Sequence, residues 1–448
     1  MSPLPYTYEE LLGPTMAQAL SAETGPSTST AHATVRSLLS GRPLPPLALC
    51  TAAGARQSID HGREAQGAWQ ASGRAARHTV VIRLRREVTA RRAAFAKVLR
   101  HTAGLGATDA AEECRDAERV LRHSTASSRH GARWWRSPLA LSPLTRPSCE
   151  PPGSVPAVTV SYGDDARPLA ALFEGALPSL LNGGAVITEV STRNAPVALA
   201  ASALAREAGL PPGVWQVVVR GEAADTSASG LRAVLAEHAD ALAPLCCPPG
   251  MGTPERTRSR PPCLLVLRHD GNAHAAARAA ARACFARAGR SCAATPLIAV
   301  HAARATDFLE ALIREAQGVT VTTALPDELH LRRLTTWADS LIAGGAHSCL
   351  PHWRPPTHPV GLVPHTPRPL LLVDPGALSD PRPEIPLGPV ALVTRFTHWA
   401  EILEHAHYTG HHLGVFTRAP LSQLAPQFAG LPGRRIHLNQ PPRAGLLP

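Results

Sequence analysis

The sequence predicts an α/β protein built on parallel β-sheets that are covered by helices. Short apolar runs typical of buried strands lie at residues 157–162, 185–189 and 214–219. Stretches with the apolar spacing of helices lie between them, at 168–181 and 196–208. The connections are short, and such a strand–helix alternation is typical of a parallel sheet with helices on its faces.

Turn-forming residues predict where these two helices end. Asn182, Gly183 and Gly184 follow the first helix, and this combination is a C-terminal capping signal. Gly209 follows the second helix and precedes the pair 211–212, two prolines that cannot continue a helix.

At 448 residues the chain is long enough for two domains with separate cores. Residues 1–57 are rich in Ser, Thr, Pro and Ala, and we expect a partly disordered N-terminal arm there. Residues 244–262 form a polar break rich in Pro and Gly. We therefore expect a first α/β domain at 58–262 and a second at 263–448.

The remaining elements follow from the same patterns. In the first domain we expect helices at 58–103, 109–130 and 231–242, whereas prolines within 134–152 argue against a regular strand pair. In the second domain we expect strands at 263–267 and 297–301 and helices at 273–287 and 307–317. Residues 320–368 show no clear pattern. Four further segments follow, at 383–396, 399–406, 414–418 and 436–439, and the one at 399–406 is expected to be a helix.

Composition excludes some classes of protein. No apolar run is long enough to span a membrane, and the first residues lack the order of a signal peptide, so we expect a cytoplasmic protein. The 9 cysteines are scattered without paired spacing, which fits a reducing compartment and gives no metal site.

The net charge of +11 raises the question of nucleic-acid binding. Lys97 is the only lysine, so nearly all basic residues are Arg, as a compositional bias would produce. Aromatic residues make up 4% of the chain, too few for a base-stacking surface. We favour a generic basic surface over a nucleic-acid site.

The stretch 207–214 (EAGLPPGV), together with 181–184 and the strand at 186–191, resembles the aldehyde dehydrogenase superfamily. The resemblance implies a Rossmann-type cofactor domain followed by a second α/β catalytic domain. It implies NAD(P)-dependent oxidation of an aldehyde to a carboxylic acid through a cysteine thiohemiacetal and thioester. The family's oligomerisation hairpin would fall near 134–156 and is expected to be degenerate. The chain ends at Pro448 without the family's C-terminal strand, which leaves assembly into a homo-oligomer open.

Residues 285–292 resemble the family's nucleophile segment, with Phe285, Gly289 and Cys292 at the matching spacing. The resemblance implies that Cys292 is the nucleophile. The alternative is an ordinary buried thiol. The resemblance places Arg256 at the position of the general base, so Glu255, one residue away, is the candidate base, and a solvated loop charge is the alternative. Ala166 stands where the oxyanion-binding Asn would be.

The cofactor contacts implied by the resemblance are Glu189, Gly250 and Glu384. Glu189 replaces a ribose-binding Lys; a carboxylate can accept from ribose hydroxyls but would repel a 2′-phosphate, which favours NAD over NADP. The phosphate-facing loop matches 246–249, where two prolines offer no N–H to an anion. Glu384 is one residue from the aligned position, which is Ile385. We therefore expect NAD binding to be weak or lost.

Three functions remain open, of which the weakest is an esterase-like thiol enzyme whose Cys292 is acylated without a nicotinamide; the missing base argues against its turnover. The first is an aldehyde-oxidising enzyme that is severely impaired, with a small aldehyde as substrate. The second is a catalytically inactive pseudoenzyme that binds protein partners as a scaffold, since family analogy supports the fold more than the activity.

Overall fold

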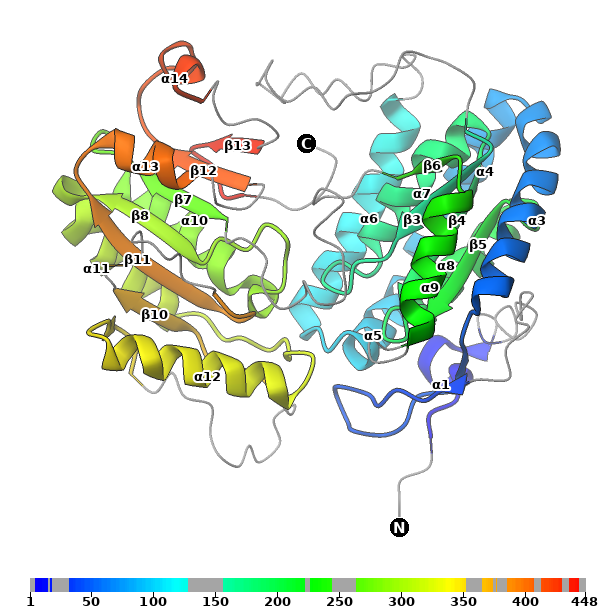
Figure 1. The fold of residues 1–448 in the computed structure, drawn as a ribbon, viewed down its shortest axis with the longest axis horizontal. Helices are drawn as coiled ribbons and strands as arrows, with labels where there is room; N and C mark the ends of the chain where they lie inside the picture. The colour runs from blue at the N-terminus through cyan, green and yellow to red at the C-terminus, as the bar shows by residue number, and fades with distance from the viewer. Residues whose placement is uncertain are drawn as a thin grey trace. The chain divides into compact units, whose positions relative to one another are not determined.

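We describe the protein from a computed structural model, which describes residues 5–14, 17, 32–127, 156–221, 226–243, 263–351, 365–373, 376, 385–406, 412–428 and 435–442 (Figure 1). These residues form two compact units, one holding elements α1 to β6 and the other β7 to β13. Each unit contains a mainly parallel sheet covered by helices, which confirms the predicted α/β class. No helix within the described ranges is long and apolar enough to cross a bilayer.

The first unit is organised around a sheet that has four strands in the described residues, in the order β5-β4-β3-β6. The strands are β3 (Val158–Tyr162), β4 (Ala185–Ser191), β5 (Trp215–Arg220) and β6 (Ala241–Leu242), and all pairs are parallel. β3 and β4 are buried along nearly their whole length, as their continuous apolar runs predicted.

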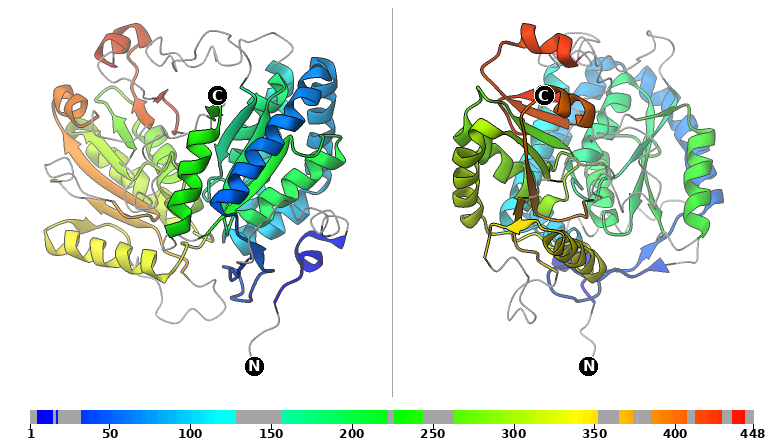
Figure 2. Two further views of the ribbon diagram at one scale, coloured as in Figure 1. Left: turned by 45° about the vertical axis from the view of Figure 1, so that its right-hand side comes forward. Right: turned by 60° about the vertical axis from the view of Figure 1, so that its left-hand side comes forward.

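Helices cover both faces of this sheet (Figures 1 and 2). Val186 packs into a core with α7 and α8, whereas its neighbour Ile187 packs on the opposite face with α3 and α9, because successive side chains of a strand alternate. The helices of this unit are α3 (Ala52–Ala71), α4 (Arg74–Ala90), α5 (Arg92–Thr102), α6 (Ala107–Ser127), α7 (Ala170–Asn182), α8 (Ala195–Glu207) and α9 (Thr226–His238).

Two helix ends test the sequence analysis. The predicted cap after α7 is confirmed, since Gly183 has a φ of 94° and its N–H donates to Leu180 O. The helix expected over 231–242 was placed too far along the chain, because α9 runs from Thr226 to His238 and residues 241–242 pair with β3 instead. The expected degenerate hairpin near 134–156 and the break at 244–262 lie almost wholly outside the described residues.

The N-terminal segment contributes to the core of the first unit. Helix α1 (Tyr8–Leu12) begins with a capping box, in which Thr7 and Glu10 bond each other's backbone, and Leu11 and Leu12 are buried. The ammonium of Lys97, on α5, donates to the carbonyl oxygen of Glu10. A short antiparallel pair, β1 (His32–Ala33) and β2 (Leu47–Ala48), follows α1, and α3 begins earlier than residue 58.

The second unit contains a sheet that has seven strands in the described residues, in the order β13-β12-β7-β8-β11-β10-β9, with β9 alone antiparallel to its neighbour. The strands are β7 (Leu264–Leu267), β8 (Leu297–His301), β9 (His347–Ser348), β10 (Leu370–Val373), β11 (Val390–Phe396), β12 (His412–Phe416) and β13 (Arg435–Leu438). Helices α10 (Ala273–Phe285) and α11 (Ala305–Gln317) cover one face, and α12 (Glu328–Ala343), α13 (Trp399–Ala406) and α14 (Leu421–Phe428) contribute to the core on the other.

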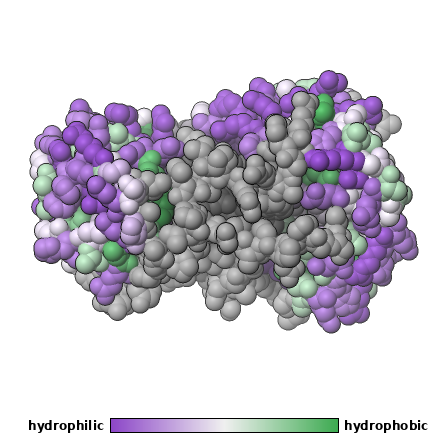
Figure 3. All heavy atoms as spheres, turned by 90° about the horizontal axis from the view of Figure 1, so that it is seen from above, coloured by the Kyte–Doolittle hydropathy of each residue, from purple (hydrophilic) through white to green (hydrophobic). Residues whose placement is uncertain are grey.

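The structure corrects one helix here. The alanine-rich stretch 273–287 was expected to be a single helix, but α10 ends at Phe285, because Arg287 and Ala288 have left-handed backbone angles. The surface seen in Figure 3 is largely hydrophilic over the described residues, with apolar side chains scattered among polar ones.

Candidate active site

Cys292 lies in a tight turn between α10 and β8 of the second unit. The N–H of Ala294 donates to Ser291 O at 2.9 Å, and the N–H of Ala293 donates to Ser291 Oγ at 3.2 Å. The thiol of Cys263 donates to the carbonyl oxygen of Cys292 at 3.4 Å. Cys292 is buried, 7% exposed, so the candidate nucleophile has a fixed backbone and little contact with solvent.

The backbone immediately before this turn is strained. Arg287, Ala288 and Gly289 have φ angles of 53°, 54° and 68°, so three successive residues adopt the left-handed conformation that only glycine adopts freely. A Cβ at Gly289 would lie 1.8 Å from the carbonyl oxygen of Gly388, so the two backbones touch. Strain of this kind persists only where the surrounding structure enforces it, and it clusters at functional sites.

Two arginines near the turn are buried together with this backbone. Arg287 is 8% exposed and Arg290 is 5% exposed, and a guanidinium nitrogen of Arg290 donates to Ala324 O at 3.2 Å. Arg290 precedes Cys292 by only two residues.

Three of the five residues predicted for the site, Glu255, Gly250 and Glu384, lie outside the described residues. Ile385, which follows Glu384, is buried in the core of the second unit. At the position where the resemblance requires a ribose-binding carboxylate, the chain therefore places an apolar core residue.

Glu189 lies at the carboxyl end of β4, and its side chain is 1% exposed. Arg220, the last residue of β5, donates to its Oε1 at 2.5 Å, and Arg232 of α9 donates to its Oε2 at 2.7 Å. A second nitrogen of Arg232 lies 3.3 Å from Oε1. Because both carboxylate oxygens are bound by guanidinium groups, Glu189 is not a free acceptor for ribose hydroxyls.

The two arginines also change the charge at this end of the sheet. One carboxylate and two guanidinium groups leave a net charge of +1, so the repulsion of a 2′-phosphate expected from an isolated Glu189 is removed. The guanidinium of Arg232 also lies over the ring of Tyr162, 5.4 Å from its centroid. Burial, together with the charge of Glu189, raises the pKa of the Tyr162 hydroxyl.

Several backbone N–H groups in the loop before α7 and at the start of that helix are already bonded within the chain. Ala166 is buried, and its N–H donates to Oδ1 of Asp164 at 2.9 Å. The N–H groups of Leu169 and Ala170, at the start of α7, donate to one oxygen of Glu113 at 3.0 and 2.8 Å. A carboxylate of the chain thus occupies the end of the helix at which anions usually bind.

A buried ion pair fixes the same loop. The guanidinium of Arg167 forms two hydrogen bonds with Glu174, at 2.8 and 2.7 Å, and both side chains are almost fully buried. Burial alone would lower the pKa of Arg167, but the hydrogen bonds and charge of Glu174, with Glu113 and Asp164 nearby, raise it above its ordinary value.

Sequence reasoning missed Glu113, Arg220 and Arg232, because each acts on a residue that is distant in the chain. It also missed Asn194, which is 2% exposed and precedes α8, and whose side-chain nitrogen and oxygen have no hydrogen-bond partner in the described part of the chain. A buried amide without partners is costly, and its usual explanation is a bound water or ligand.

The residues of the first unit do not fit a nicotinamide dinucleotide in the manner that the resemblance implied. The carboxylate of Glu189 is occupied by Arg220 and Arg232, and the N-terminus of α7 is occupied by Glu113. Ile385 of the second unit offers no polar group. We therefore derive no catalytic step through this cofactor.

Comparison with known proteins extends these observations. A sequence model of the aldehyde dehydrogenase family matches residues 26–237. A 3,6-anhydro-α-L-galactose dehydrogenase of Streptomyces coelicolor is 26% identical over 307 residues, which are 61% of this chain and 58% of that protein. The chain thus matches less than two thirds of its curated relative's length.

Solved structures of the same fold cover nearly the whole chain. The structure is similar to an NADP-dependent glyceraldehyde-3-phosphate dehydrogenase of Bacillus halodurans, with a TM-score of 0.74 and 16% identity over 93% of this chain and 89% of the other. It is also similar to an NAD-dependent benzaldehyde dehydrogenase of Corynebacterium glutamicum, with a TM-score of 0.73 and 18% identity over 93% and 92% of the two chains. These structural likenesses confirm the aldehyde dehydrogenase fold, and the match to the family's sequence model over 26–237 supports the resemblance to that superfamily.

Proposed function

We propose that the protein oxidises an aldehyde to a carboxylic acid in an NAD(P)-dependent reaction, at a rate far below that of an intact enzyme. The observation that carries this proposal is the placement of Cys292 in a rigid turn, directly after the strained segment 287–289. Backbone strain costs free energy, and its presence beside a thiol supports a retained catalytic loop.

Cys292 performs the first step. Its thiolate sulfur attacks the aldehyde carbon, the carbonyl π pair moves to oxygen, and a thiohemiacetal alkoxide results. To go further, the reaction would require a nicotinamide to accept the hydride, a group that the described residues of the first unit do not hold in the manner that the resemblance implied. Glu255 remains our candidate for the general base in hydrolysis of the thioester.

Three features support a low rate. Ala166 supplies no side-chain donor, and the loss of one such donor typically costs about a hundred- to a thousandfold in rate. Glu189 is occupied by two arginines, and Ile385 is apolar. These replacements also support the second candidate, an inactive scaffold that keeps the fold and binds a protein partner.

We expect wild-type protein to reduce NAD or NADP slowly in the presence of an aldehyde, and Cys292→Ala to reduce the rate to background, because the substitution removes the thiol to which we assign the acyl intermediate. The aldehydes to test are those of the relatives: 3,6-anhydro-L-galactose, glyceraldehyde 3-phosphate and benzaldehyde. Cys349→Ala is the matched control, since Cys349 is a half-buried thiol of the same unit whose pKa is raised by burial. Formation of the reduced nicotinamide is the measurement.

The outcomes separate the two functions. Equal rates for wild type and Cys292→Ala would refute Cys292 as the nucleophile. No turnover, together with no heat of binding for NAD or NADP by calorimetry, would favour the inactive scaffold.

A further inference from the structure

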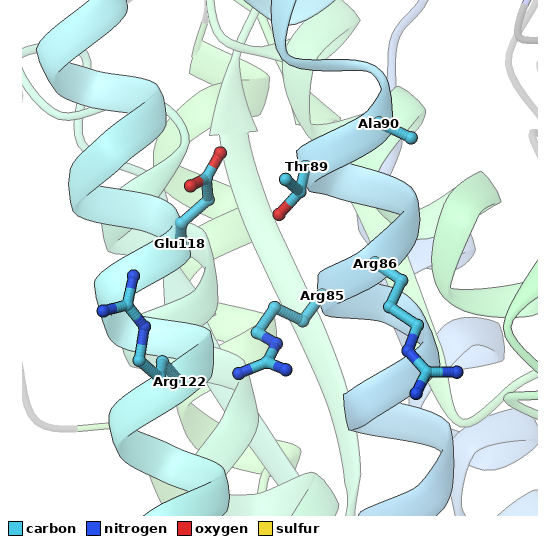
Figure 4. Close-up of a pocket in the computed structure, with 6 residues that line it drawn as sticks. All are labelled: Arg85, Arg86, Thr89, Ala90, Glu118 and Arg122. Atoms are coloured by element: carbon cyan, nitrogen blue, oxygen red, sulfur yellow. The ribbon is translucent and has the colours of Figure 1, made fainter.

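A hollow of about 470 Å³ lies between α4 and α6 on the first unit. It is lined by Arg85, Arg86, Thr89, Ala90, Glu118 and Arg122. Figure 4 shows Arg85 reaching from α4 toward α6, where Glu118 and Arg122 lie, with Thr89 directed into the same space. None of these residues belongs to the candidate active site.

The single carboxylate of the hollow is already neutralised. Arg92, just beyond α4, donates to both oxygens of Glu118, at 2.6 and 2.7 Å, and Glu118 is buried. In contrast, the side chains of Arg85, Arg86 and Arg122 form no hydrogen bond or ion pair in the structure as described. Three arginines without an acidic partner among the described residues therefore line the hollow; the guanidinium of Arg85 extends toward α6, whereas that of Arg86 extends away from it (Figure 4).

Several neighbouring arginines are paired with acidic residues. On α6, Arg115 pairs with Glu112 and Arg119 with Asp116, each three residues apart. Arg91, which follows α4, pairs with Glu87 and Glu207. Most cations around the hollow thus have an acidic partner, whereas those that line it do not.

We propose that this hollow binds a phosphate-bearing small molecule with at least two negative charges. Guanidinium groups present paired N–H donors that match phosphate oxygens, and the Thr89 hydroxyl adds another donor. The volume falls in the range of small-ligand sites, and a concave basic surface concentrates anions. The neutralised Glu118 forms part of the wall. The site is independent of Cys292 and of the proposed oxidation.

Inorganic tripolyphosphate and a nucleoside triphosphate both contain a chain of three phosphates with several negative charges. Isothermal titration calorimetry of the full chain with tripolyphosphate, and separately with ATP, distinguishes these two sources, because tighter binding of ATP would assign part of the affinity to the nucleoside. Orthophosphate serves as the ligand with less charge. We expect affinity to fall from tripolyphosphate to orthophosphate, and to fall with added salt.

The double variant Arg85→Gln/Arg122→Gln should weaken tripolyphosphate binding by about a hundredfold, since each charge-assisted contact contributes about tenfold. Arg74→Gln is the control, because Arg74 is an exposed arginine of α4 outside the hollow. Each arginine of the hollow lies at the surface, and a thermal melt confirms that both proteins are folded.

Three results would overturn the proposal. These are the absence of binding by wild type, an equal loss in Arg74→Gln, which would indicate attraction to overall charge alone, and tighter binding of duplex DNA that the double variant abolishes.

Discussion

Gly289→Ala is expected to destabilise the second unit severely, by about 3 kcal/mol or more, because two separate costs add. Gly289 has a φ of 68°, which costs an alanine about 1–2 kcal/mol. The added Cβ would also lie 1.8 Å from Gly388 O, a backbone atom that cannot rotate away. The loop 287–289 or the loop at 388–389 must therefore shift, and each is packed in the core. Thermal and urea unfolding measure the loss.

Gly345→Ala is the matched control for this experiment. Gly345 belongs to the same unit and has a φ of 106°, but a Cβ there would meet no atom within 4 Å. It therefore incurs backbone strain without the clash, and we expect a loss of about 1–2 kcal/mol. Equal losses for the two variants would show that the close approach to Gly388 does not matter.

Arg167→Met is expected to cost about 3–5 kcal/mol, because it leaves the Glu174 carboxylate buried without its partner. Glu174→Leu should cost a similar amount of free energy, because it leaves the Arg167 guanidinium buried without its partner. The double variant should be markedly more stable than either single variant, since replacement of both charges leaves neither uncompensated. Urea unfolding of the four proteins, the wild type included, forms the double-mutant cycle.

The control for this cycle is an ion pair on the surface. Arg332 and Glu328 pair on α12, with both side chains largely exposed, and breaking that pair should cost less than about 1 kcal/mol. A double variant at 167 and 174 that is no more stable than the single ones would contradict the account of the buried pair.

The sequence allowed the first sheet to be predicted because its strands are continuous apolar runs bounded by capping residues, as at Gly183. Helix α12 was not predicted, although Leu331, Leu334, Ala338 and Leu341 recur at helical spacing and pack into the core. Strand β6 was absorbed into a helix because two residues carry no pattern of their own.

The site was less predictable, for a physical reason. The spacing of Phe285, Gly289 and Cys292 identified the candidate nucleophile, and the structure adds why a glycine stands at 289. The partners of Glu189 lie 31 and 43 residues away, so no local pattern connects them. The sequence therefore showed Glu189 as an isolated charge, whereas the fold supplies its two counter-ions.

Lys97 is the single lysine of the chain and lies within α5. A protease that cuts only after lysine thus has one target, the peptide bond to Val98, which is 0% exposed. The bond becomes accessible only when α5 unwinds and the ammonium of Lys97 leaves the carbonyl oxygen of Glu10. Digestion at Lys97 yields the same two fragments from every molecule. The rate of cutting therefore measures how often this part of the first unit opens, and opening of the second unit does not contribute to it.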